Sequence, residues 1–369
     1  MGCEKPTVLG YMKSQPEVLK RIYEGREKFV QPFVETFLKK DIKKVLFFGS
    51  GTSYNVSNIA AYYFKHMVEI DAEAQYPTVY QHYETANRYA FIKDEQVLCV
   101  GISQSGTSIS TINMLEEARR RGHSTLVLTS NLQSEITRHV DVVTELLVGP
   151  ELVPPETKGY TASVISVYLW ALECAKALKR MSNEEYVQCL NELEELIRDF
   201  DEVVGDSEAW YERVKPTILN SDRIYVLGYG VDYATVLEGQ LKIAEMLRYP
   251  IVGYEIEEFM HGPTPAITPK VTFFLVGSEE VEFERMLLIR RALLNYTERV
   301  HVISCSKQVD HVSEKDMIFR GHYNKMIAPL AYTVPMQFVA AKGAKDIGID
   351  TNIWPFKEPI AHLQEEDEE

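Results

Sequence analysis

The chain has 369 residues, of which 45% are hydrophobic and 25% charged, a globular composition with enough length for two domains. Its formal net charge of −15 argues against a nucleic-acid partner, because a phosphate backbone requires a basic protein face. The five cysteines lack metal-ligand spacing, no apolar run is long enough to cross a membrane, and no signal-peptide pattern is present, so we expect a cytoplasmic protein without metal, cofactor or membrane partner.

Five segments follow one another along the chain. We expect a helical segment, a first α/β unit, a charged helical connector, a second α/β unit and an irregular tail. The connector is predicted from the acidic, helix-spaced run NEEYVQCLNELEELIRDF. The predicted bounds of the five segments are 1–30, 31–180, 182–215, 216–345 and 346–369.

A pattern of strand-like runs occurs twice. KKVLFFGSGTSY (43–54) matches DRIYVLGYGVDY (222–233) with an offset of 179 residues. In the same order, VLCVGIS (97–103) matches TFFLVGS and STLVLTSN (124–131) matches RVHVISCS. Continuous apolar runs are typical of strands buried on both faces of a parallel sheet. Apolar residues at helical spacing predict helices over 54–67, 108–122, 234–247 and 284–295. The fold class is therefore α/β, with two flavodoxin-like, doubly wound parallel-sheet units in tandem.

Two loops of the first unit carry glycine and small hydroxyl residues where a strand meets a helix. These are FFGSGTSYN (47–55) and GISQSGTSIS (101–110). Freed backbone N–H groups, Ser and Thr hydroxyls and the positive end of a helix dipole together bind phosphate. The alternative is an ordinary polar loop with a serine N-cap, but two such loops in one unit favour an anionic ligand.

The second unit differs at the corresponding loop. Ser278 is followed there by Glu279, Glu280 and Glu282, and three carboxylates would repel a phosphate. We therefore expect only the first unit to hold phosphate. A dinucleotide site is disfavoured because Tyr54 and Tyr233 stand where the third glycine of that fingerprint belongs.

The helix of the second unit that follows its glycine turn carries candidate catalytic residues. Glu238, Lys242 and Glu245 lie at helical spacing on one face, a pattern that a surface salt-bridge helix would also show. The position of this helix directly after the turn places it at the ligand edge of the sheet. His261 precedes Gly-Pro in a bent loop, where an imidazole is accessible and can transfer a proton at neutral pH.

Taken together, these motifs resemble the tandem sugar isomerase (SIS) domain family over roughly residues 35–340. GTSY, SQSG, ETKGYT (156–161), LEGQLKIAE, HGP and Pro335-Met336-Gln337 stand in the family's order. The chain is similar to the isomerase half of glutamine:fructose-6-phosphate aminotransferase and to fructosamine-6-phosphate deglycases. The resemblance implies a phosphorylated sugar substrate whose 6-phosphate and hydroxyls are bound by Gly51, Thr52, Ser53, Ser103, Gln104, Ser105, Ser108 and Thr157.

The resemblance also assigns roles at the reacting carbons. It implies that Glu245 is the base at sugar carbons 1 and 2, that Lys242 and Glu238 support it, and that His261 is the acid/base for ring opening or the leaving group. It further implies a homodimer with shared sites, in which the His261 loop reaches from the partner.

Three departures from the family pattern qualify the expected activity. First, we expect no glutaminase domain. Second, Glu156 replaces a small serine of the family's pocket, where its carboxylate can pair with an amine-bearing substrate. Third, Lys357 is only a loose counterpart of the lysine near the end of the synthase. The first hypothesis is therefore a deglycase that releases an amine from a 6-phosphorylated ketosamine. One alternative is an aldose/ketose isomerase of amino-sugar phosphates. The other is a sugar-phosphate sensor without catalysis.

Overall fold

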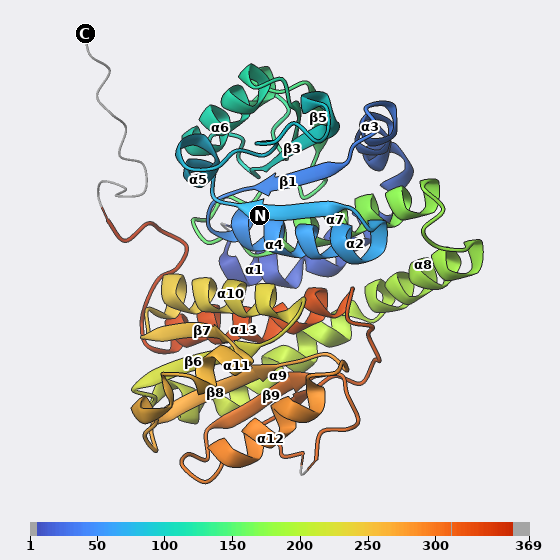
Figure 1. Ribbon diagram of the computed structural model, residues 1–369. Coiled ribbons are helices and arrows are strands. Elements are labelled where there is room, and N and C mark those ends of the chain that lie inside the picture. The colour runs from blue at the N-terminus through green and yellow to red at the C-terminus, as the bar shows by residue number, and fades with distance from the viewer. Residues whose placement is uncertain (1–5, 311, 357–369) are drawn as a thin grey trace.

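The strands form two parallel sheets of five in the part of the chain that the structure, a computed structural model, describes, which is residues 6–310 and 312–356 (Figure 1). The first sheet consists of β1 (Lys44–Phe48), β2 (Asp71–Gln75), β3 (Val97–Ile102), β4 (Ser124–Thr129) and β5 (Val142–Glu145). The second consists of β6 (Arg223–Gly228), β7 (Ile251–Glu255), β8 (Val271–Val276), β9 (Val300–Ser304) and β10 (Met317–Ile318). The orders β2-β1-β3-β4-β5 and β10-β9-β8-β6-β7 are the same flavodoxin-like order in each unit, which confirms the predicted fold class.

The strands that the apolar runs predict are the inner ones. β1, β3, β4, β6, β8 and β9 are all found, and nearly every residue in them is buried. The sequence analysis missed β2, β5, β7 and β10. These strands lie at or next to sheet edges and are short or only partly buried, so they lack a continuous apolar run.

Helices cover both faces of each sheet. In the first unit and before it they are α1 (Val8–Lys13), α2 (Gln15–Glu24), α3 (Arg26–Lys39), α4 (Thr52–Tyr63), α5 (Pro77–His82), α6 (Ile109–Arg120) and α7 (Lys158–Ala177). Then follow α8 (Asn183–Arg198), α9 (Phe200–Leu219), α10 (Asp232–Lys242), α11 (Ile256–Met260), α12 (Phe283–Leu293) and α13 (Ala328–Asp346). Single 3₁₀ turns occur at Asp94–Gln96, Glu135–Arg138 and Thr264–Ala266.

The duplication extends to an irregular turn after α4 and α10. Each helix ends in a π-helical turn, Phe64–Val68 in the first unit and Ile243–Leu247 in the second. Each turn is followed by a non-glycine residue in the left-handed region, Glu69 with φ 56° and Arg248 with φ 61°. Such turns are frequent at functional sites, and the second one contains Glu245.

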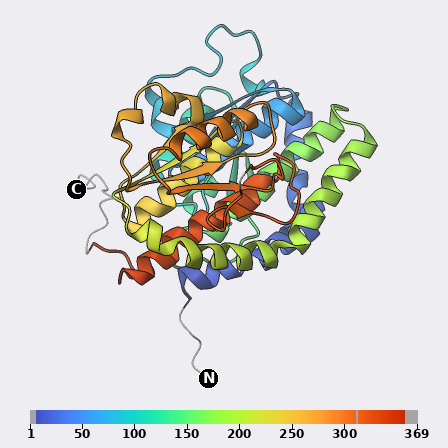
Figure 2. The same ribbon diagram turned by 90° about the horizontal axis from the view of Figure 1, so that it is seen from below.

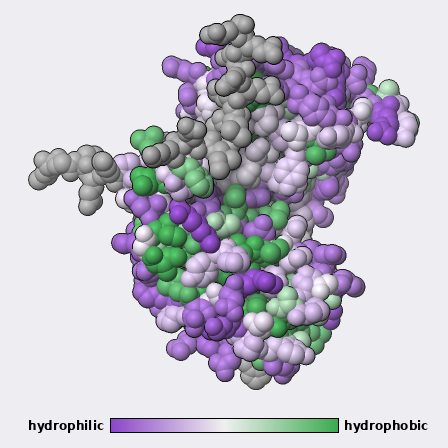
Figure 3. Space-filling model, turned by 90° about the vertical axis from the view of Figure 1, so that its left-hand side faces the viewer, coloured by the Kyte–Doolittle hydropathy of each residue, from purple (hydrophilic) through white to green (hydrophobic). Residues whose placement is uncertain are grey.

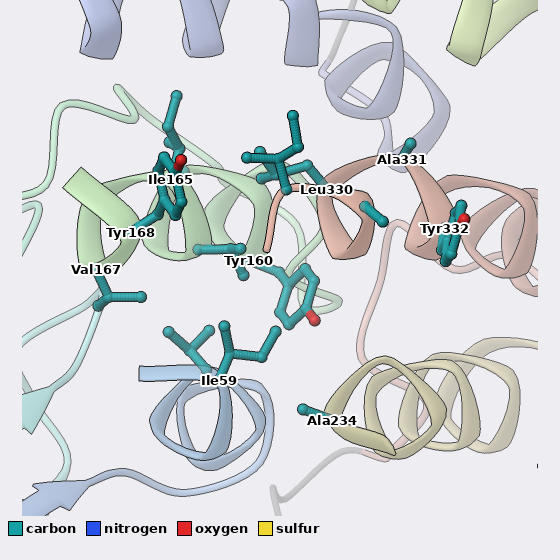
Figure 4. Close-up of a cluster of buried hydrophobic side chains, with 14 of the residues drawn as sticks. Ile59, Tyr160, Ile165, Val167, Tyr168, Ala234, Leu330, Ala331 and Tyr332 are labelled. Carbon is teal, nitrogen blue, oxygen red and sulfur yellow. The ribbon is translucent and has the colours of Figure 1, made fainter. Parts of the chain in front are cut away.

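Four helices, α4, α7, α10 and α13, lie between the two sheets and join the units into one core. Figure 4 shows Ile59 of α4, Tyr160 of α7, Ala234 of α10 and Leu330 of α13 converging there. α7 and α13 are buried on almost all sides, so their sequences carry no amphipathic stripe and they were not predicted as helices.

Two motif residues have structural roles at this helix interface. Gly239 of α10 faces α13, where a Cβ atom would lie 2.1 Å from the sulfur of Met336, so a larger residue would require the Met336 side chain to move. The buried side chain of Gln337 accepts a hydrogen bond from Gln15 Nε2 (3.0 Å) and donates one to the carbonyl of Thr157 (3.2 Å). Met336 and Gln337 thus fix the helices that support the loop before α7.

The predicted connector consists of α8 and α9. Ser182 caps the N-terminus of α8. Its hydroxyl accepts a hydrogen bond from the backbone N–H of Glu185, and its own backbone N–H donates one to the Glu185 carboxylate. α9 runs along α13 beneath the second sheet (Figure 2). Within the described residues, no helix combines the length and the apolar character that crossing a bilayer requires.

Candidate active site

A cavity of about 420 Å³ lies where β1, β3 and β4 end. It is lined by six serines, Ser50, Ser53, Ser103, Ser105, Ser108 and Ser130, and by Gln104. We call it the serine cavity. Five of the predicted substrate-binding residues, Ser53, Ser103, Gln104, Ser105 and Ser108, therefore meet in one place. Ser50 and Ser130, which the sequence analysis did not single out, complete the set.

The loops of the serine cavity have the geometry of an anion site. Gly51 (φ 58°) and Gly106 (φ 70°) adopt left-handed conformations before α4 and α6, whose N-termini follow each loop. At Gly106 a Cβ atom would lie 1.9 Å from Ser134 Oγ, so the turn depends on glycine. Freed N–H groups and the positive ends of two helices thus accompany the hydroxyls at the cavity.

Two predicted substrate-binding residues direct their hydroxyls elsewhere in this structure. Thr52 donates a hydrogen bond to Glu238 Oε1 (3.3 Å), and Thr157 donates one to Glu151 Oε1 (2.8 Å). Neither lines the serine cavity, and Gly51 contributes only the backbone turn. Their side chains position carboxylates that surround the site.

Glu151, which the sequence analysis missed, anchors the loop before α7. Its carboxylate accepts hydrogen bonds from the backbone N–H groups of Thr157 (2.9 Å), Lys158 (3.1 Å) and Gly159 (3.0 Å). It also accepts one from Gln104 Nε2 (3.2 Å). This single side chain satisfies the N-terminus of α7 and orients an amide of the serine cavity.

We expect Glu151→Ala to lower the free energy of unfolding by about 2 kcal/mol, because three buried N–H groups lose a charged acceptor. Guanidinium unfolding followed by tryptophan fluorescence measures the change. Glu298→Ala, at a glutamate that is 92% exposed, is the control and should leave stability unchanged. Equal stability of the two variants would contradict the anchoring role.

A buried ammonium lies between two carboxylates beside the cavity. Lys242 Nζ is 2.8 Å from Glu245 Oε2 and 3.8 Å from Glu238 Oε1, and the side chains of Lys242 and Glu238 are 2% and 0% exposed. Burial disfavours the charge on Lys242, but the two carboxylates outweigh it and raise its pKa to about 12. Glu238 also accepts a hydrogen bond from Asn55 Nδ2 (2.8 Å), another residue the sequence analysis missed. The three residues that the sequence places on one helical face, Glu238, Lys242 and Glu245, thus form an ion network that is largely buried.

Glu156, the residue that departs from the family pattern, lines the serine cavity. Burial and the neighbouring carboxylate of Glu151 raise the pKa of Glu156 to about 8. Near pH 7 the side chain is therefore mostly uncharged, and it does not repel an anion in the cavity. A bound cationic amine would favour the charged form instead.

Glu245 lines a second cavity, of about 510 Å³, which adjoins the first. Its 28%-exposed carboxylate faces walls made mainly of Pro154, Pro155, Ile353, Trp354 and Phe356. We call it the apolar cavity. Pro154 lines both cavities, so the serines and Glu245 lie on either side of one short loop. Lys357, the loose lysine candidate, lies outside the described residues.

His261 lies in neither cavity of this chain. It is exposed and follows α11, with its backbone N–H donating to the carbonyl of Glu258 (3.1 Å). The accessible loop that the Gly-Pro sequence predicts is present. Within one chain, however, the imidazole does not line the cavity that contains Glu245.

At the edge of the second sheet that is equivalent to the serine cavity of the first, carboxylates of the protein itself contact neighbouring groups. Asp232 Oδ2 accepts a hydrogen bond from the backbone N–H of Ser278 (2.7 Å), and Glu280 forms an ion pair with Lys325. Gly230 approaches Glu280 so closely that a Cβ atom would lie 3.0 Å from its carboxylate. That the second unit does not hold phosphate stays a prediction, since these contacts do not test it.

Asp232 makes stability depend on pH. Burial raises its pKa to about 7, above the ordinary 3.8, so the stability that the protonated carboxyl contributes at acidic pH is lost as the pH rises from about 4 to 7. We expect Asp232→Asn to remove this loss. Between pH 5 and pH 8 the variant should lose about 2 kcal/mol less than the wild type in guanidinium unfolding. The same pH dependence in both proteins would show that Asp232 does not titrate in this way.

Comparisons with known proteins agree with this architecture. The family model described as SIS domain matches residues 40–173 and again 217–342. The glutamine–fructose-6-phosphate aminotransferase (isomerizing) of Caldanaerobacter subterraneus subsp. tengcongensis is 26% identical over 315 residues, which are 84% of this chain and 50% of that protein. The chain thus spans about half the length of the curated relatives it matches.

Two solved structures share the fold over nearly all of the chain. The C-terminal domain of glucosamine-fructose-6-phosphate aminotransferase from Francisella tularensis superposes with a TM-score of 0.81 at 18% identity, covering 95% of this chain and 98% of that one. Glucosamine-6-phosphate deaminase from Thermotoga maritima superposes with a TM-score of 0.75 at 21% identity, with the same coverage of 95% and 98%.

Proposed function

Because this chain belongs to the SIS domain family, we propose that it is an enzyme that releases the amine from a 6-phosphorylated ketosamine by hydrolysis. One observation carries the proposal: the cavity that contains the Glu245 carboxylate adjoins the serine cavity at Pro154. A sugar phosphate seated by its phosphate among the serines then extends its other end, carbons 1 and 2, toward Glu245.

The serine cavity suits the phosphate end of the substrate. The hydroxyls of Ser53, Ser103, Ser105 and Ser108 and the amide of Gln104 supply neutral donors, and two helix N-termini add positive potential. Thr52 and Thr157 act here as positioning residues, through Glu238 and Glu151. A strongly acidic protein in this way binds an anion without a cluster of basic side chains.

Glu245 supplies the base. In the open-chain ketosamine, carbon 1 carries the amine and carbon 2 the ketone. Glu245 takes a proton from carbon 1, and the return of a proton to carbon 2 gives the imine of an aldose. Water adds to the imine carbon and the carbon–nitrogen bond breaks, so that ketosamine and water give free amine and aldohexose 6-phosphate. Lys242 Nζ donates a hydrogen bond to Glu245 (2.8 Å) and so holds that carboxylate in position, and Glu238 pairs with Lys242 from the other side.

His261 is assigned to the site of a partner subunit in a homodimer. The exposure of His261, its absence from the lining of both cavities of its own chain and the family resemblance support this assignment. The imidazole opens the sugar ring or protonates the leaving amine. If the assignment is right, mixing Glu245→Gln and His261→Gln proteins after unfolding and refolding restores turnover that neither has alone. If mixing restores no turnover, either Glu245 and His261 of one subunit act in the same site or His261 takes no part in the reaction. Both outcomes would contradict the assignment.

Product analysis tests the proposed reaction directly. The chain is incubated with a ketosamine 6-phosphate such as fructoselysine 6-phosphate in deuterium oxide, and amine and sugar are followed by NMR. The proposal predicts free amine and an aldose 6-phosphate that carries deuterium at carbon 2. An isomer formed without amine release would make the protein an isomerase, and thermal stabilisation without any product would make it a sensor; either result overturns the proposal.

A further inference from the structure

The apolar cavity beside Glu245 is larger than a proton-transfer site needs. At about 510 Å³ it can hold a group of amino-acid size beyond the sugar. The segment that follows α13 builds one wall, and this segment runs along the left side of the molecule in Figure 1. Ile353, Trp354 and Phe356 are 61%, 38% and 55% exposed there. Large apolar side chains left open around a cavity mark a binding surface.

The side of the molecule along which this segment runs is mixed in character. Figure 3, which views that side of the molecule, shows hydrophobic side chains gathered between hydrophilic ones. The cavity itself has apolar walls and two charged groups, Glu245 and Arg248. Such a combination fits a ligand with an apolar body and a small number of polar anchors.

Arg248 is the unexplained charge. No residue in the ranges 6–310 and 312–356 forms an ion pair or a side-chain hydrogen bond with its guanidinium, which is exposed at the cavity. Its backbone is held in the left-handed region, with φ 61° and its N–H donating to the carbonyl of Ile243 (3.0 Å). A guanidinium at the cavity that has no partner among the described residues is suited to a planar carboxylate, which it can bind through two hydrogen bonds.

We infer that the apolar cavity binds the amine portion of the substrate and that this portion is an apolar amino acid joined to the sugar through its α-nitrogen. The inference rests on the proposed function, which places the nitrogen beside Glu245. Arg248 follows Glu245 by three residues in the same turn, so a carboxylate held by Arg248 lies near that nitrogen. An α-linked amino acid has this short spacing between nitrogen and carboxylate, and its side chain then lies against Trp354 and Phe356.

The test uses reduced conjugates, in which the ketone is replaced by a hydroxyl so that no chemistry occurs. Calorimetry measures the affinity of four compounds built on 1-amino-1-deoxysorbitol 6-phosphate. The first has an unsubstituted nitrogen, and the others carry on that nitrogen phenylalanine linked through its α-nitrogen, phenethylamine, or lysine linked through its ε-nitrogen. We expect the phenylalanine conjugate to bind at least tenfold more tightly than the unsubstituted compound and than the phenethylamine conjugate, which lacks the carboxylate. Tightest binding of the ε-linked lysine conjugate, or equal binding of all four, would overturn the inference.

Two variants locate the effect. Arg248→Gln should reduce the preference for phenylalanine over phenethylamine by about tenfold or more, and Trp354→Ala should reduce the preference for phenylalanine over no substituent. Arg88→Gln and Phe91→Ala, at exposed residues that line neither cavity, are the matched controls and should keep both preferences. Unchanged preferences in the first pair would overturn the inference.

The two proposals fail in different ways. If the reduced conjugates show the expected preferences but no amine is released from the corresponding ketosamines, the proposed reaction is wrong and the binding site stands. If amine is released from ketosamines at rates that do not depend on the substituent, and the reduced conjugates bind equally, the reaction stands and the amino-acid site is wrong.

Discussion

Glu245→Gln is expected to lower kcat for amine release by about 10²–10⁴-fold while KM for the sugar phosphate stays within a few fold. Glutamine keeps an oxygen that can accept the hydrogen bond that Lys242 Nζ donates to Glu245 (2.8 Å), and Glu238 still pairs with Lys242, so we expect the fold to persist. What disappears is the ability to take a proton from carbon 1. Steady-state release of amine from a ketosamine 6-phosphate measures the effect.

The control for this variant is another helical glutamate. Glu27 of α3 is exposed and lines neither cavity, so Glu27→Gln should leave kcat and KM unchanged. Deuterium exchange at carbon 1 gives a second readout, which should fall in parallel with kcat in the Glu245 variant. Turnover and exchange that both survive the substitution would remove Glu245 from the reaction.

Lys242→Met is expected to destabilise the protein by about 3–5 kcal/mol. The substitution leaves Glu238, which is fully buried, without the ammonium 3.8 Å away that compensates its charge. Burial already raises the pKa of Glu238, and without Lys242 that pKa rises further. The loss of stability should therefore be larger at pH 8 than at pH 5, where the carboxyl is more readily protonated.

Guanidinium unfolding at both pH values measures the loss. Adding Glu238→Gln to Lys242→Met removes the uncompensated charge and should recover part of the stability. Lys65→Met, at an exposed lysine in the equivalent turn of the first unit, is the matched control and should change stability by less than about 0.5 kcal/mol. Equal effects at positions 242 and 65 would show that the buried network contributes nothing to stability.

The sequence predicted the fold wherever burial is complete on both faces of a strand. Apolar runs such as VLFF in β1 and FFLV in β8 predict inner strands, and the repetition of these runs along the chain predicts two α/β units. β2, with the sequence DAEAQ, and the two-residue β10 are specified by pairing with a neighbouring strand rather than by their own composition. α7 and α13 escaped prediction because helices buried on all sides have no polar face.

The candidate site was predictable where topology alone brings residues together. Ser53 and Ser103 follow parallel strands of one sheet, so the ends of those strands place them at one edge. Ser130, after β4, could have been found by the same rule. Contacts that depend on long-range packing could not: Asn55 and Glu238 are 183 residues apart in the chain, yet their side chains form a hydrogen bond.

The apolar cavity was hidden from the sequence for a similar reason. Its walls come from the loop before α7, from the turn that contains Glu245 and from residues 351–356 after α13. Only the segment that contains Glu245 has a regular period, so no pattern in the sequence indicates that the three segments meet. Glu151 was missed because its partners are backbone N–H groups, which any sequence supplies.

The most direct test of this account is a crystal structure of the Glu245→Gln protein with a ketosamine 6-phosphate bound. We expect the phosphate to accept hydrogen bonds from Ser53, Ser103, Ser105 and Ser108, with carbons 1 and 2 within contact distance of residue 245 and the nitrogen directed toward the apolar cavity. A phosphate bound outside the serine cavity, or carbons 1 and 2 turned away from residue 245, would contradict the account.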